Sequence, residues 1–285
     1  MQLGSIARWL KGDSRVWEGQ HFTVATDGRG KDIVFVHGLA ASPECWDEAG
    51  DRLGAGFRSH YVHMRGFAGL PPSGFREPGN FMKPVADALA GYIRTLKVGK
   101  VAVVGHSMGG IVTLILARDH PDVVDRLMVV DVPAFFSVLI NPFASAGAMG
   151  SLAEHSRRSY FEKSHKAMED DMRRSADKLV TDPDRLERVI EWGITSDRAT
   201  TADVMAEVMV TDLRQDMQKI EAPVDVIYAW DKAGHATKVG LDQVYGSSYS
   251  GLKQVKRLRI DQARHYVMLD QPEAFYHAVR DWMAR

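Results

Sequence analysis

At 285 residues, the chain is long enough for one large α/β domain, or two modest ones, with a sizeable buried core. Its formal net charge of −1 excludes the strong basic bias that favours nucleic acid or an anionic membrane as a partner. A single cysteine, Cys45, excludes an internal disulfide framework and a cysteine zinc cluster, so no structural metal is expected.

We expect no export or membrane signal at the beginning of this sequence. Residues 1–11 place basic side chains within a short apolar patch and are interpreted as a surface arm or short helix. The longest apolar stretch, residues 98–117, contains Lys100, His106 and several glycines, which favours a buried β-turn-α unit over a membrane span. We therefore expect a cytoplasmic protein, although a chain trimmed of its export leader would look the same.

Strands and helices alternate along most of the chain. A run in which apolar and polar residues alternate, ending in a glycine-rich turn, predicts an edge strand. Continuous apolar runs predict buried parallel strands. The edge strand is expected at residues 21–26, and further strands at 32–36, 59–64, 101–104, 126–130, 223–230 and 255–260. Helices are expected at residues 43–53, 81–96, from Met108 onward and at 272–284. This alternation predicts an α/β fold, with a mostly parallel sheet between two layers of helices.

Residues 134–220 interrupt this alternation. They show no convincing strand, and they are too many for a bare loop. Helical patterns over residues 151–176, 184–192 and 201–219 indicate a helical lid inserted after the sixth strand, which divides the core domain into residues 1–133 and 221–285. Most lid methionines and aromatic residues are expected to pack against the core. Because the lid enters and leaves at the carboxyl edge of the sheet, four of its residues are predicted to contact substrate: Phe135, Phe136, Met205 and Met209.

A Gly-x-Ser-x-Gly pattern, Gly105 to Gly109, follows one apolar run and precedes another. The pattern alone arises by chance in roughly one chain in ten of this length, so its context decides its meaning. A strand that turns sharply into a helix needs small residues around the turn, and the serine hydroxyl is then lifted out of the sheet. Ser107 is therefore the candidate nucleophile.

A serine hydroxyl needs a base, and the base needs an orienting carboxylate. Of the histidines, His265 has the best setting, because it lies in the loop after the final strand and faces the same sheet edge as Ser107. His106, beside the nucleophile, is expected to serve packing or a structural hydrogen bond. Asp231 and Asp131 both end apolar strands at this edge; Asp231 is preferred because it preserves the chain order Ser, Asp, His, and Asp131 is the alternative acid.

An oxyanion hole requires two N–H donors that point at the developing charge. Met108, at the start of the helix after Ser107, supplies one. The loop His37-Gly38-Leu39-Ala40 follows the strand at residues 32–36, and the Leu39 N–H is expected to supply the other, with Ala40 as the neighbouring alternative. His37 and Gly38 are predicted to lie against the substrate.

These motifs in this order resemble the α/β-hydrolase superfamily across nearly the whole chain, and within it single-domain bacterial carboxylesterases with a helical lid. The quoted motifs are His37-Gly38, Arg65-Gly66-Phe67, Gly105-His106-Ser107-Met108-Gly109-Gly110, and then Asp231 and His265. The resemblance implies an eight-stranded type of sheet, a Ser-Asp-His triad, no cofactor, and an ester or a similarly activated carbonyl compound as substrate.

The predicted function is hydrolysis of a carboxylic ester with an apolar acyl or aryl part, through an acyl-enzyme intermediate. The same triad would also serve carbon-carbon hydrolysis of a dienoic ring-cleavage product, acyl transfer, lactone opening or perhydrolysis. An epoxide hydrolase or haloalkane dehalogenase is disfavoured, because both need a carboxylate at the position of Ser107. A non-catalytic ligand receptor is the alternative from a different class, and it would have no use for a proton shuttle.

Overall fold

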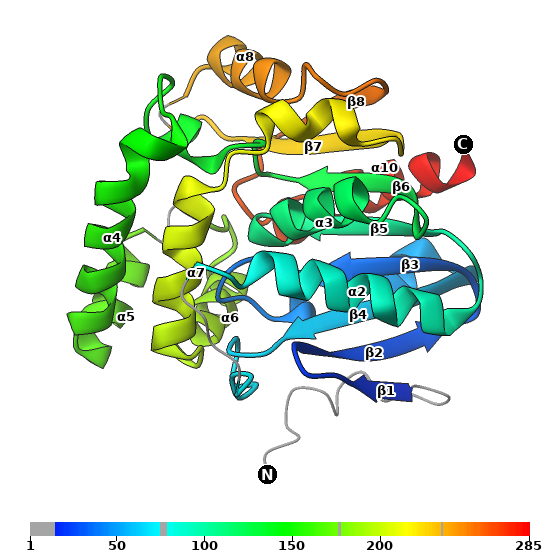
Figure 1. Ribbon diagram of the computed structural model, residues 1–285, viewed down its shortest axis with the longest axis horizontal. Helices are drawn as coiled ribbons and strands as arrows, with labels where there is room; N and C mark the ends of the chain where they lie inside the picture. Colours follow the sequence, from blue (N-terminus) through cyan, green and yellow to red (C-terminus); the bar gives the residue numbers. More distant parts are fainter. Residues whose placement is uncertain (1–14, 75–78, 176–177, 235) are drawn as a thin grey trace.

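The computed structural model describes residues 15–74, 79–175, 178–234 and 236–285, so the arm expected at residues 1–11 lies outside the described residues. Within the described residues, eight strands form one sheet in the order β1-β2-β4-β3-β5-β6-β7-β8 (Figure 1). β2 is antiparallel to both of its neighbours, and all the other pairings are parallel. The predicted fold, a mostly parallel sheet flanked by helices, is confirmed.

The strands are short and mostly buried. β5 is buried at every residue, and β3, β4 and β6 are buried over their carboxyl-terminal halves, which is typical of parallel strands covered on both faces. Their bounds are β1 Arg15–Glu18, β2 Phe22–Gly28, β3 Gly30–Val36, β4 Gly56–Met64, β5 Val101–His106, β6 Val124–Val130, β7 Val224–Trp230 and β8 Val255–Asp261.

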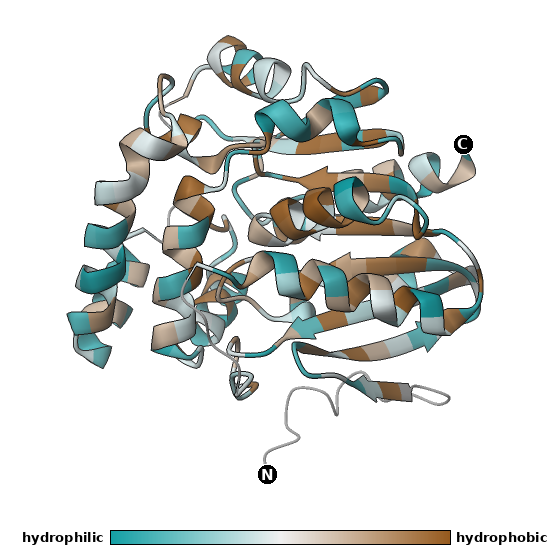
Figure 2. Ribbon diagram, viewed as in Figure 1, coloured by the Kyte–Doolittle hydropathy of each residue, from teal (hydrophilic) through white to brown (hydrophobic). Residues whose placement is uncertain are grey.

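Alternate residues of β3 enter two separate cores, one on each face of the sheet. Val34 and Val36 pack with α2 and α3, whereas Ile33 and Phe35 pack with α1, α9 and α10. Figure 2 shows apolar residues concentrated on the central strands and on α3. The helix bounds are α1 Ala49–Leu53, α2 Met82–Leu96, α3 Met108–Asp119, α8 Lys238–Ser248, α9 Val267–Asp270 and α10 Pro272–Ala284.

The segment between β6 and β7 is helical, and Figure 1 shows it beyond the carboxyl ends of the parallel strands. Its α-helices each begin at a residue whose side chain accepts a backbone N–H of the first turn: Ser145, Ser164, Asp182 and Asp197. Its elements are η3 Phe136–Leu139, α4 Ala146–Glu162, α5 His165–Arg174, α6 Pro183–Ile194, α7 Arg198–Val210 and η5 Arg214–Lys219. None of the helices in the described part of the chain is long and apolar enough to cross a membrane.

Three local expectations differ from the structure. The strand expected at the sheet edge is β2, which is paired on both sides because β1 lies outside it. The helix expected at residues 43–53 is broken into η2 (Pro43–Trp46) and α1. The Asp47 N–H donates a hydrogen bond to the Glu44 carbonyl, and this bond ends the first turn. α8 was not predicted, since its apolar residues do not follow a clear helical period.

Candidate active site

Ser107 occupies the sharp turn between β5 and α3. Its φ of 54° and ψ of −127° are rare for a residue with a Cβ atom. Two backbone hydrogen bonds hold this conformation: the Ser107 N–H donates to the Val130 carbonyl at 2.8 Å, and the Ser107 carbonyl accepts the Gly110 N–H at 2.7 Å. The serine is thereby fixed at the carboxyl end of its strand, where it lines a cavity.

The glycines on either side of the serine are required by close approach of the chain. A Cβ atom at Gly105 would lie 2.4 Å from Thr113 Oγ1 and 2.5 Å from the Gly109 carbonyl oxygen. A Cβ atom at Gly109 would lie 2.3 Å from the carbonyl oxygen of His37. All three distances are below van der Waals contact, so this turn and the close packing of α3 against the end of β3 both depend on glycine.

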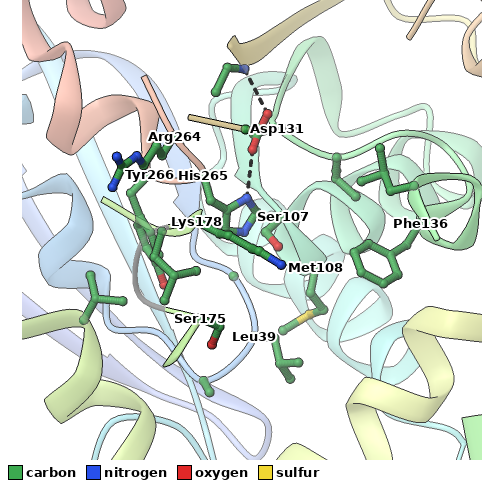
Figure 3. A pocket seen from close by; sticks show the side chains of 18 of the residues that line it. Leu39, Ser107, Met108, Asp131, Phe136, Ser175, Lys178, Arg264, His265 and Tyr266 are labelled. Carbon is green, nitrogen blue, oxygen red and sulfur yellow. Dashed lines mark hydrogen bonds and ion pairs between the residues drawn. The ribbon is translucent and has the colours of Figure 1, made fainter. Parts of the chain in front are cut away.

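His265 is paired with Asp131. The distance between His265 Nδ1 and Asp131 Oδ2 is 2.8 Å (Figure 3). The other carboxylate oxygen accepts the backbone N–H of Ala229 at 2.9 Å and the hydroxyl of Tyr245 at 3.2 Å. Because the carboxylate only accepts, it favours the tautomer with the proton on Nδ1, which leaves Nε2 of His265 able to accept a proton. His265 and Ser107 line the same cavity.

The preference for Asp231 as the acid is therefore corrected in favour of Asp131. Asp231 follows β7, and its carboxylate accepts a hydrogen bond of 2.9 Å from Arg264 Nε, which lowers the pKa of Asp231. β6 is adjacent to the strand of Ser107 in the sheet, and β7 is one strand farther away. The loop after β8 consequently presents its arginine to Asp231 and its histidine to Asp131.

The backbone of His265 is held on both sides. His106 Nε2 donates to the His265 carbonyl at 2.9 Å, and the His265 N–H donates to the Lys178 carbonyl at 3.3 Å. His106 is fully buried, and burial lowers its pKa well below the usual value. The neutral imidazole thus serves as a structural hydrogen-bond donor, as the sequence had indicated.

His37 lies outside the cavity and anchors the loop that lines it. Its Nδ1–H donates to the Gly38 carbonyl at 2.8 Å, and its Nε2 accepts the Met64 N–H at 3.1 Å. Complete burial, together with the neighbouring His63, lowers the pKa of His37 to about 3, so the ring is neutral near pH 7. The prediction that His37 lies against substrate is corrected, since the ring is buried behind Gly38.

The two proposed oxyanion donors belong to elements that meet at Ser107. Gly38, Leu39 and Ala40 line the same cavity as Ser107 and Met108. Met108 is the first residue of α3, so its N–H has no partner within the helix, and the positive end of the helix dipole lies there. This arrangement is suited to stabilising negative charge next to the serine.

The cavity has a volume of about 750 Å³, within the range of small-molecule sites. Of the residues predicted to contact substrate, Gly38, Phe136 and Met205 line it. Phe135 and Met209 do not line it, because both side chains are buried in a small core with Met149 and Ala153 of α4. Their expected contact with substrate is thus corrected.

Several lining residues were not predicted from the sequence. The segment between β6 and β7 contributes Leu139, Tyr160, Met168, Met172, Lys178, Val189, Thr201 and Val208, and α8 contributes Leu241 and Tyr245. Met168 and Met172 are four residues apart on α5, and this helical spacing was the one available signal.

Comparison with known proteins agrees with this architecture. Two curated relatives are pimeloyl-acyl-carrier protein methyl ester esterases. The one from Nitrosomonas europaea is 25% identical over 72% of this chain and 79% of its own. The one from Aeromonas salmonicida is 25% identical over 89% of this chain and 95% of its own. The crystal structure of a hydrolase from Pseudomonas aeruginosa matches with a TM-score of 0.76 and 19% identity, covering 96% of this chain and 99% of that one.

A family model, described as the alpha/beta hydrolase family, matches residues 33–278. The match begins in β3 and ends in α10, so it includes the turn at Ser107, Asp131 and the loop that carries His265. The chain belongs to the alpha/beta hydrolase family.

Proposed function

We propose that this protein is a cofactor-independent serine hydrolase that cleaves carboxylic esters with an apolar acyl or aryl part. The hydrogen bond from His265 Nδ1 to Asp131, in a cavity that also contains Ser107, is the observation that carries the proposal. The names of the curated relatives from Nitrosomonas and Aeromonas describe esterases, which supports an ester as the bond that is cleaved.

In the proposed mechanism, Ser107 Oγ attacks the ester carbonyl carbon while His265 Nε2 takes the hydroxyl proton. Asp131 stabilises the resulting imidazolium, and the N–H groups of Leu39 and Met108 stabilise the oxyanion. His265 then returns the proton to the leaving alkoxide, and the alcohol departs. Water attacks the acyl-enzyme in the same way and releases the carboxylic acid.

The substrate class follows from the surroundings of the serine. Most side chains that line the cavity are apolar, including Phe136, Met168 and Met205. An apolar acyl or aryl group would therefore be removed from water in the bound state. In this proposal residues 134–220 act as a lid that covers the acyl group.

The test is turnover of p-nitrophenyl butyrate by the wild type and by Ser107→Ala. Loss of the nucleophile should reduce kcat by a factor on the order of 10⁴ or more. Ser247→Ala, at an exposed position of α8, is the matched control and should retain wild-type activity. Equal rates for Ser107→Ala and the wild type would overturn the proposal.

A further inference from the structure

One cation in the cavity has no partner among the residues that the structure describes. Lys163 forms an ion pair with Asp171, and Arg264 forms one with Asp231 at 2.9 Å. Lys178 lines the same cavity, and within the described residues no carboxylate or hydrogen-bond acceptor contacts its ammonium group.

The backbone places Lys178 next to the triad histidine. The Lys178 carbonyl accepts the His265 N–H at 3.3 Å, and the next carbonyl, that of Leu179, accepts the Tyr266 N–H at 3.0 Å. These paired bonds join the two chain segments beside the site. Figure 3 shows the Lys178 side chain extending from this segment into the cavity, below the ring of His265 and toward Met108.

We propose that Lys178 binds a carboxylate of the substrate, so that the preferred substrate is a monoester of a dicarboxylic acid. This inference rests on the proposed ester hydrolysis. The other charged groups of the site that the structure describes, Asp131 and Arg264 among them, already have partners, so within that part of the chain Lys178 is the cation available to an incoming anion. Among the described lining residues Lys178 offers one unpaired positive charge, which matches one negative charge and favours a carboxylate over a doubly charged phosphate monoester.

Monomethyl adipate and methyl hexanoate test this assignment, because they present the same ester on a chain that ends in a carboxylate or in a methyl group. The measured quantity is the ratio of kcat/KM for the anionic ester to that for the neutral ester. Lys178→Met should lower this ratio about tenfold, the effect of one partly solvated charge pair. Lys178→Arg should keep most of the wild-type ratio, because it keeps the positive charge. Lys166→Met on α5 should not change the ratio, because Lys166 is largely exposed and lies outside the cavity.

A ratio unchanged in Lys178→Met, with both esters still hydrolysed, would overturn the role of Lys178 and leave the proposed function intact. If the wild type hydrolyses neither ester, the proposed function fails, and binding of monomethyl adipate is measured by calorimetry in Ser107→Ala. The inference then requires about tenfold weaker binding when Lys178→Met is added. Equal affinities in the two proteins would contradict it.

Discussion

At the scale of single residues, the central finding concerns which aspartate meets the histidine. The Asp131 carboxylate accepts hydrogen bonds from the His265 ring, the Ala229 N–H and the Tyr245 hydroxyl, whereas Asp231 forms an ion pair with Arg264. A carboxylate that accepts this many hydrogen bonds is held in one orientation, and the tautomer of the histidine follows from it.

Asp131→Asn and Asp231→Asn should therefore differ widely. Asparagine at residue 131 can present its amide to His265 and select the wrong tautomer, so we expect kcat to fall by a factor on the order of 10³ to 10⁴. Asparagine at residue 231 removes an ion pair with Arg264 that is partly exposed, and we expect less than a tenfold loss. The measurement is kcat for p-nitrophenyl butyrate. Similar losses in both variants would show that neither aspartate has the assigned role.

At the scale of elements, the turn from β5 into α3 is governed by sterics. The start of α3 packs so closely against the end of β3 that a Cβ atom at Gly109 would overlap the carbonyl oxygens of Val36 and His37. The same contact brings the start of α3 against the backbone of Val36 and His37, directly before the loop that contains Leu39. The glycine pattern thus secures both the position of the nucleophile and the proposed oxyanion hole.

Gly109→Ala should lower the free energy of unfolding by several kcal/mol, since backbone must move to admit the methyl group. It should also reduce esterase activity, because the Met108 N–H moves with the helix. Gly91→Ala is the matched control: Gly91 lies on the exposed side of α2, a Cβ there meets nothing within 4 Å, and stability should rise by about 0.5 to 1 kcal/mol. Urea unfolding of both variants measures the effect. An unchanged midpoint for Gly109→Ala would contradict the steric argument.

At the scale of the whole molecule, the sequence predicted the sheet class, most of the strands and the helical character of residues 134–220. Those features follow from apolar periodicity, which is local. The choice between Asp131 and Asp231 was not predictable in this way, because it depends on the spatial order of the strands and on the path of the loop after β8. The same holds for Phe135 and Phe136, neighbours in the chain of which Phe136 lines the cavity and Phe135 is buried in the small core with α4.

The lining of the cavity likewise depends on contacts that local sequence patterns do not show. Met168 and Met205 come from different helices, and the pairing of Lys178 with the backbone of His265 joins segments far apart in the chain. The composition of the helices between β6 and β7 indicated apolar contacts at this edge of the sheet. It did not indicate which side chains enter the cavity, because that depends on how each helix is rotated about its axis.

The central claim, that Ser107 is an activated nucleophile, is tested most directly by covalent labelling. The wild type is incubated with a fluorophosphonate, digested and mapped by mass spectrometry, with a known serine hydrolase as the positive control. We expect one adduct, on the peptide that contains Ser107, and no adduct in Ser107→Ala. A wild type that stays unlabelled while the control reacts, or an adduct on another serine, would contradict it.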